Sequence, residues 1–225
     1  MPETSSPLTG APASPVPRVR VRNIQLARAI IALVAALVIT FSPDHSAGYG
    51  LFVFAGFAIV TAAVLAVAAA LTYPGGRRWS WITNAAITLV AGLVAIVPAL
   101  HTTPVFFAVV ITWAAVTGIV EIVGAGRDRL RMREAGIVDP QRRSEARDGT
   151  TVGVLTVVLA MAIGLVSPDL SYDYFIDDAG QWFALTGIVV AVGLFGGYAA
   201  IVAVYLGIAA FTPQREVSIP EEESA

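Results

Sequence analysis

Neither cysteine nor lysine occurs in this 225-residue chain, so disulfide bonds and thiol catalysis are excluded. Charge is scarce as well: 13% of the residues are Asp, Glu, Lys or Arg, against about 25% in soluble domains. The chain also lacks a glycine-rich phosphate loop, a Gly-x-Ser-x-Gly elbow, a His-Glu-x-x-His motif and a basic face with interleaved aromatic residues. We therefore expect a protein that is not an enzyme, with no catalytic residue, no cofactor, no metal and no nucleic-acid partner.

Long uncharged stretches take the place of those features. A helix needs about 20 apolar residues to cross the hydrocarbon core of a bilayer, and 56% of this chain is hydrophobic. The stretch from Trp79 to Val120 is long enough for two crossings and the last stretch for one long crossing. The uncharged stretches are His45 to Gly76, Trp79 to Val120, Gly149 to Pro168 and Ala179 to Gln214. They predict an integral membrane protein.

All fourteen basic residues are arginine, and they fall in alternate connections between the apolar stretches. They precede the first span, lie between spans 2 and 3 and between spans 4 and 5, or follow span 6. The other three connections contain no arginine and carry aspartate and histidine instead. Because cytoplasmic loops are enriched in basic residues, both termini are expected in the cytoplasm.

An internal repeat organises the apolar stretches into helical hairpins. The stretch Trp81 to Gly126 reads as two helices that are separated by a break from Pro98 to Pro104. Shifted back by 56 positions it matches the preceding hairpin, with His101 on His45; shifted forward by 69 it places Trp113 on Trp182. Internal repeats are common in bilayer proteins. The prediction is an all-α polytopic membrane protein with six transmembrane helices in three repeated hairpins.

The predicted organisation has three parts. Residues 1–22 form a disordered, proline-rich cytoplasmic tail, and residues 212–225 form an acidic cytoplasmic tail. Residues 23–211 form the membrane domain, with repeats at about 23–73, 79–126 and 148–211. An arginine-rich cytoplasmic loop at 127–148 separates the second and third repeats. It acts as a topology determinant, or it attracts anionic lipid headgroups.

The boundaries of several spans lead to specific expectations. Span 4 should continue as helix to Glu134, with a break at Gly136 and Pro140, and span 5 should begin near Thr150. Span 6, read as a helix from Trp182 to Phe211, would be about 45 Å long, so it must tilt or project into the cytosol. Arg28, close to the start of span 1, is expected to reach the headgroups by snorkelling.

Glu121 is the only acidic residue inside an apolar run. It precedes Arg127 by six residues, so it lies about 9 Å further into the membrane. An intramembrane carboxylate is a candidate functional group, for example in a proton relay. The alternative is an interfacial glutamate that pairs with an arginine of the neighbouring loop.

His45, His101 and Asp44 lie in the loops on the outer side. Histidine changes its charge between about pH 5 and 8, so these residues are candidates for sensing an acidified outer surface. A metal site from two histidines and an aspartate is conceivable, but no Cys/His spacing supports it. Solvated loop histidines without a special role are the other interpretation.

Small residues recur at four-residue spacing and allow helix backbones to approach closely. They serve packing among the six spans or contact between copies of the chain. Expected partners are therefore membrane lipids and, in the second case, another copy of the chain, while the sequence identifies no other protein partner. The small residues are Ala58, Ala62, Ala66 and Ala70 in span 2, Gly149 and Gly153 in span 5, and Gly193 and Gly197 in span 6.

The repeated motifs resemble those of a known family. They are Ile31-Ala-Leu-Val-Ala-Ala-Leu-Val before Ser42-Pro43, Ile87-Thr-Leu-Val-Ala-Gly-Leu-Val before Pro98, and the helix from Trp113 to Gly126 with Thr-Gly-Ile-Val. Together they are similar to HdeD-type acid-resistance membrane proteins of bacteria, over about Asn23 to Phe211. The resemblance implies a six-span inner-membrane bundle that is linked to survival under acid stress and has no known catalytic site.

We therefore expect a bacterial inner-membrane protein with a structural or protective role in acid or envelope stress. Arginine without lysine, together with abundant alanine, valine and glycine, is typical of a GC-rich bacterial gene. A small transporter or channel subunit and an accessory subunit of a membrane enzyme are the alternatives.

Overall fold

The computed structural model describes residues 21–71, 78–137, 139–176 and 180–212. The expected tails at 1–20 and 213–225, and the expected Pro74-Gly75-Gly76 turn, lie outside the described residues. In chain order the elements are α1 (Val21–Phe41), α2 (Ala47–Leu71), α3 (Arg78–Ala95), the short 3-10 helix η2 (Pro98–Leu100), α4 (Thr103–Glu134), α5 (Pro140–Gly164), β1 (Ser171–Ile176), β2 (Gln181–Thr186) and α6 (Gly187–Phe211).

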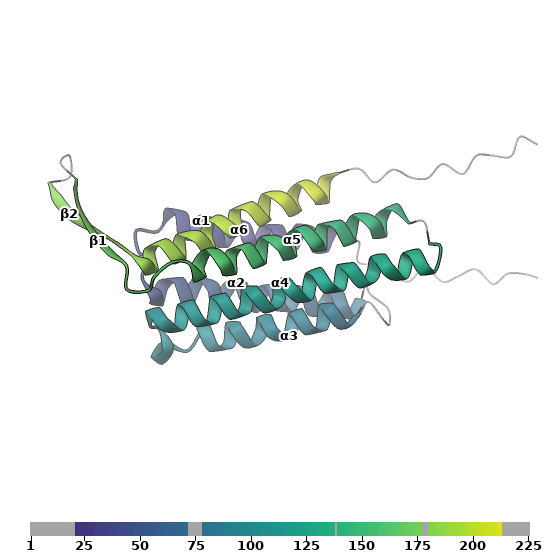
Figure 1. The fold of residues 1–225 in the computed structure, drawn as a ribbon, viewed down its shortest axis with the longest axis horizontal. Coiled ribbons are helices and arrows are strands. Elements are labelled where there is room, and N and C mark those ends of the chain that lie inside the picture. Colours follow the sequence, from purple (N-terminus) through teal and green to yellow (C-terminus); the bar gives the residue numbers. More distant parts are fainter. Residues whose placement is uncertain (1–20, 72–77, 138, 177–179, 213–225) are drawn as a thin grey trace, which may run out of the picture.

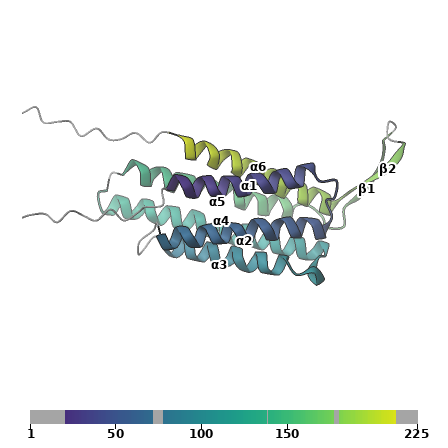
Figure 2. The ribbon, with the colours of Figure 1, turned by 180° about the vertical axis from the view of Figure 1, so that it is seen from behind.

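The six α-helices form one elongated bundle with their axes roughly parallel (Figures 1 and 2). Each helix contacts the helix before it and the helix after it, and α1 also contacts α6. The most extensive contacts join α1 to α6, α2 to α3 and α4 to α5. The start of α1 and the end of α6 lie close together, as the Arg22 guanidinium 5.4 Å above the centre of the Phe211 ring shows.

Within the described chain, five helices are long and apolar enough to cross a membrane: α1, α2, α4, α5 and α6. The sixth, α3, has 18 residues and is about 27 Å long. Its first half carries the polar residues Arg78, Ser80 and Asn84, which lower its hydropathy. It nevertheless lies alongside α2 and α4 through most of the bundle (Figures 1 and 2).

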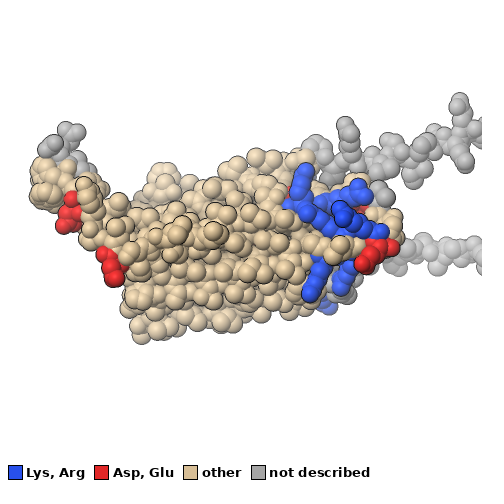
Figure 3. All heavy atoms as spheres, viewed as in Figure 1, with Lys and Arg blue, Asp and Glu red and all other residues tan. Residues whose placement is uncertain are grey.

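Polarity is distributed along the bundle axis. Large aliphatic side chains such as Val34, Val90 and Val204 are more than half exposed around the middle, where hydrocarbon is the natural solvent. Arginine gathers at the end where the described chain starts and finishes, and the opposite end shows acidic residues near the β-strands (Figure 3). The separation of charge predicted from the sequence therefore corresponds to the two ends of the bundle.

The structure is helical as predicted, except for a short β-hairpin that the sequence analysis did not predict. β1 and β2 pair antiparallel, from Ser171 opposite Thr186 to Ile176 opposite Gln181, and the hairpin projects beyond the bundle (Figure 1). The segment is rich in aromatic residues, which favour strands, and Gly180 near the turn has a φ of 62°. The continuous hydropathy of 182–211 concealed this change of conformation.

The hairpin also changes the predicted sixth span. α6 begins at Gly187 and not at Trp182, so it has 25 residues and is about 37 Å long. The predicted match between Trp113 and Trp182 is wrong, because Trp113 is buried in α4 while Trp182 is 71% exposed in β2.

The arginine-rich segment 127–148 is mostly helical. α4 ends at Glu134, which is the predicted end of the helix of span 4. The predicted break at Gly136 is also present, because this residue adopts a φ of 62°. α5 starts at Pro140, ten residues before the predicted start at Thr150, and the Asp139 side chain caps it by accepting a hydrogen bond from the Arg142 amide. The ends of α4 and α5 thus extend beyond the other helices (Figure 1).

Gly118 of α4 and Gly153 of α5 allow the backbones of these two helices to approach closely. A Cβ atom on Gly118 would lie 2.8 Å from the Gly153 carbonyl oxygen, and a Cβ on Gly153 would lie 2.8 Å from the Gly118 carbonyl oxygen. In contrast, a Cβ on Gly193 or Gly197 of α6 would meet no atom within 4 Å. The span 5 glycine therefore serves internal packing, while the span 6 glycines do not.

We expect Gly118→Ala to lower the free energy of unfolding by about 1–3 kcal/mol, because the added methyl group overpacks the contact between two backbones. Gly197→Ala is the matched control and should leave stability unchanged or raise it by up to about 1 kcal/mol, since alanine favours helix. Thermal unfolding of both variants in detergent micelles measures the difference. Equal stability of the two variants would contradict the close α4–α5 contact.

Candidate functional site

An aromatic cluster fills the centre of the bundle. It consists of Phe54 and Phe57 of α2, Trp113 of α4, and Phe195 and Tyr198 of α6. The rings meet edge to face, with centroids 5.1 Å apart for Phe54–Trp113 and 5.7 Å apart for Phe57–Trp113, a favourable arrangement for aromatic quadrupoles. This aromatic cluster joins the three helices that come second in each predicted hairpin.

The interior towards the β-hairpin end is also packed with apolar side chains. Leu51, Phe106 and Val192 lie one or two turns from the aromatic cluster and are each 0% exposed. A Cβ on Gly50 would lie 2.6 Å from Val192 and 2.8 Å from Phe106. The aromatic cluster and these residues fill the interior on the hairpin side with buried apolar side chains.

Hydroxyl groups surround the aromatic cluster on its other side, towards the arginine-rich end. The Trp113 indole N–H donates to Thr88 Oγ1 of α3 at 3.1 Å. Thr156 of α5 and the Tyr198 hydroxyl are hydrogen-bonded at 2.9 Å. Because both pairs are buried, their hydrogen bonds offset the cost of removing these polar groups from water.

Glu121 lies about two turns after Trp113 on α4, towards the arginine-rich end, and pairs with Arg28. The Arg28 Nη2 atom of α1 is 2.8 Å from Glu121 Oε1 of α4, and the two side chains are 15% and 16% exposed. The predicted partner, an arginine of the neighbouring loop, is therefore wrong. The predicted snorkelling of Arg28 is also wrong, because its guanidinium points to a carboxylate inside the bundle.

A cavity of about 70 Å³ lies between this ion pair and the arginine-rich end. A smaller cavity of about 30 Å³ adjoins it on the side of the aromatic cluster. Arg28, Leu65, Asn84 and Glu121 line both cavities. The ion pair therefore stands where the two cavities meet.

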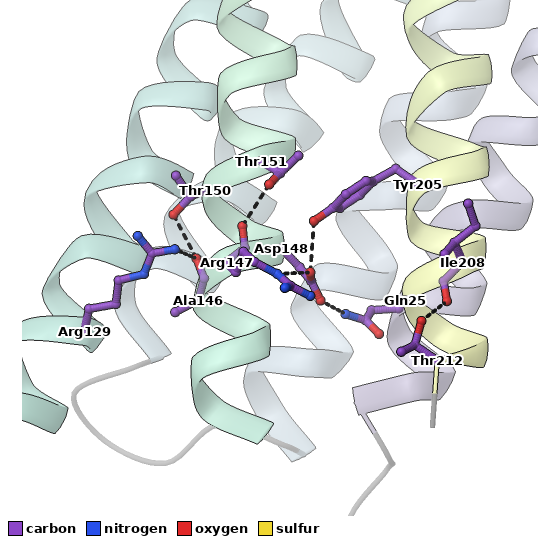
Figure 4. A network of polar contacts seen from close by, with 10 residues as sticks. All are labelled: Gln25, Arg129, Ala146, Arg147, Asp148, Thr150, Thr151, Tyr205, Ile208 and Thr212. Carbon is purple, nitrogen blue, oxygen red and sulfur yellow. Dashed lines mark hydrogen bonds and ion pairs between the residues drawn. The ribbon is translucent and has the colours of Figure 1, made fainter. Parts of the chain in front are cut away.

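Asp148 is a second interior carboxylate, and the sequence interpretation missed it because it assigned this residue to a loop. It is 6% exposed and accepts hydrogen bonds from Gln25 Nε2 of α1 at 2.9 Å and from the Tyr205 hydroxyl of α6 at 3.0 Å (Figure 4). Asp148 thus ties α5 to α1 and α6. The sequence did contain a signal for this site: the polar residues Gln25 of span 1 and Tyr205 of span 6 both lie near the arginine-rich end of their spans.

The predicted pH-sensing residues lie at the opposite end. Asp44 is exposed and its Oδ1 accepts the Ser46 amide at 2.8 Å, which lowers the pKa of this carboxyl. A lowered pKa stabilises the fold above the ordinary carboxyl pKa, and that contribution disappears as the pH falls through the folded-state value. Acidification therefore weakens the turn that starts α2.

His101 has a structural position. Its Nε2 lies 3.0 Å from the Ala95 carbonyl oxygen at the end of α3, and a Cβ on Gly48 would lie 3.5 Å from its Nδ1. His45 is partly buried beside Asp44. Among the described residues, no three His, Cys, Asp or Glu side chains are grouped to hold a metal ion.

The fold and site define a class: a multi-pass helical membrane protein with an ion pair inside the bundle. Comparison of the sequence with protein-family models gives no match, and comparison with curated proteins and with solved structures gives no significant match. The resemblance to HdeD-type proteins therefore rests on the repeated sequence motifs alone.

We expect Arg28→Gln and Glu121→Gln each to lower the free energy of unfolding by about 3 kcal/mol, because each leaves the other charge unpaired inside the bundle. The double variant should lose less than the sum of the two, which a double-mutant cycle in detergent measures. Arg147→Gln is a suitable control, because that side chain is 71% exposed and should cost less than about 1 kcal/mol. Additive losses would show that Arg28 and Glu121 do not interact.

Proposed function

We propose that the chain is a six-span bacterial inner-membrane protein, built from three copies of a helical hairpin, with its arginine-rich end in the cytoplasm. The support is the alternation of contacts: α2–α3, α4–α5 and α1–α6 are each extensive, while α1–α2, α3–α4 and α5–α6 are each smaller. This is the pattern expected of three equivalent units around an axis. α3 is the short sixth span.

The aromatic cluster supports the same repeat in a corrected register. Phe57, Trp113 and Tyr198 occupy corresponding places in α2, α4 and α6, and Thr88 and Thr156 of the preceding helices hydrogen-bond to the last two. Tyr198 follows Trp113 by 85 positions. That is 16 more than the predicted 69 and 17 more than the 68 positions between Thr88 and Thr156, and the hairpin Ser171–Thr186 has 16 residues. An inserted hairpin in the third copy accounts for the difference.

The role that the geometry supports best is that of a non-catalytic, non-conducting membrane component with a protective function in acid or envelope stress. The observation that carries it is the closed interior: the aromatic cluster, Leu51, Phe106 and Val192 occupy the bundle centre between the hairpin end and the polar cavities. Such a bundle preserves the barrier instead of opening a path through it. The link to acid stress rests on the resemblance to HdeD-type proteins.

A transporter or channel subunit is the second candidate, favoured by the carboxylate of Glu121 beside an interior cavity. An accessory role is the third. The ends of α4 and α5 extend past the bundle and are held together by a small buried contact of Ala125, Met132 and Ala146. The arginines on these ends suit docking to an acidic partner or to anionic lipid headgroups.

The proposed topology predicts where reporter proteins become active. Green fluorescent protein fused after the C-terminus should fluoresce, because that end is cytoplasmic, and alkaline phosphatase inserted at Gly180 should be active in the periplasm. Whole-cell fluorescence and phosphatase assays measure the two. Phosphatase activity of a C-terminal fusion would contradict the assignment.

The proposed function predicts that purified protein in liposomes conducts no protons above protein-free liposomes, because its interior is closed by the aromatic cluster. A strain without the gene should survive less well at low external pH and grow normally at neutral pH. Dye-detected proton flux and viable counts measure these outcomes. Flux that disappears in Glu121→Gln would favour the transporter, and equal survival of both strains would refute the protective role.

A further inference from the structure

Two buried polar atoms in the described part of the chain have no hydrogen-bond partner: Thr61 Oγ1 and Asn84 Oδ1. Thr61 is 8% and Asn84 is 6% exposed. Both residues line the smaller cavity, and Asn84 also lines the larger one. A buried polar atom without a partner is costly, so these atoms indicate that something polar occupies the cavities.

The size of the cavities suits water. A buried water needs about 10–15 Å³ of such space and two to four polar partners, so the larger cavity of about 70 Å³ has room for about five waters and the smaller one, of about 30 Å³, for about two. The polar partners are present: Asn84, Thr61, Thr117, Arg28 and Glu121 line the smaller cavity. Engineered cavities that stay dry are lined by apolar groups instead.

The charged groups that face the larger cavity are unevenly distributed. α1 contributes Arg28, α4 contributes Glu121 and Asp128, and α5 contributes Glu145 and Asp148. The lining residues from α2, α3 and α6 are uncharged. Arginines also lie at this wall, because Arg129 donates to the Ala146 carbonyl oxygen at 3.2 Å and Arg147 Nε lies 4.0 Å from Asp148 Oδ1. The lining is therefore charged and polar, as a water-filled cavity requires.

We propose that the two cavities form an aqueous vestibule, which is defined by Thr61, Asn84, Glu121 and Arg28 and is open to the arginine-rich end only. It holds water as far as the hydroxyl layer at Thr88 and Thr156, and the aromatic cluster lies beyond that layer. The vestibule brings solvent to the Arg28–Glu121 pair from one side of the membrane. The proposal does not depend on the protective role, because it concerns only where water enters the bundle.

The absence of cysteine makes the test direct. Asn84→Cys and Thr61→Cys place one thiol in the vestibule, and Ala58→Cys, one turn from Thr61 and 0% exposed, places one in the dry interior. Ag⁺ is applied to membrane vesicles of either orientation, and the thiols left unreacted are then labelled with a maleimide after denaturation. Asn84→Cys and Thr61→Cys should lose maleimide labelling when Ag⁺ is on the arginine-rich side and keep it when Ag⁺ is on the hairpin side.

Ala58→Cys should keep its labelling in both orientations. Three results would each overturn the vestibule. They are loss of maleimide labelling at all three thiols, retention of labelling at all three, and loss of labelling at Asn84→Cys or Thr61→Cys when Ag⁺ is on the hairpin side. An experiment on the unaltered chain covers the case in which a variant does not fold. In water-edited solid-state NMR of the full chain in lipid, the Asn84 side-chain amide should receive magnetisation from water as fast as the exposed loops do, and transfer as slow as that to Phe54 would also overturn the proposal.

Discussion

The bundle depends on the edge-to-face contacts of Phe57, Trp113 and Phe195 at its centre. Inside a membrane, apolar side chains gain little by leaving lipid for protein, so close packing and internal hydrogen bonds must hold helices together. These rings supply the packing, and Trp113 is in addition fixed by its hydrogen bond to Thr88. Because the rings come from α2, α4 and α6, they hold these three helices together, and α1, α3 and α5 pack around them.

The polar groups are arranged in depth relative to that centre. The hydroxyls of Thr88 and Thr156 come first, then the Arg28–Glu121 pair, then Asp148 with Gln25 and Tyr205. The two layers that contain charged groups lie nearer to the arginine-rich end than the hydroxyl layer does, and more water can compensate their charge there. The cost of burying polar groups is thus kept low by the order in which they occur.

Hydropathy and arginine placement were sufficient to predict the helical bundle and the concentration of arginine at one end, because both follow directly from transfer free energies. The same hydropathy misled at Trp182, since an apolar strand that projects from the bundle and an apolar helix have similar average composition. Glu121 was recognised from its isolation in an apolar run, whereas its partner was not. Pairing with Arg28 depends on α1 and α4 approaching across the bundle, and no local pattern encodes that approach.

The contact of α1 with α6 has a consequence for biogenesis. Helices enter the bilayer in the order of synthesis, so α1 is inserted before the other five described helices, but its most extensive contact is with α6, the last of the six. Until α4 arrives, Arg28 has no Glu121 to neutralise it, and until α6 arrives, one face of α1 is solvated by lipid. The nascent chain therefore stays an open arc of helices until α6 has entered the bilayer and packs against α1.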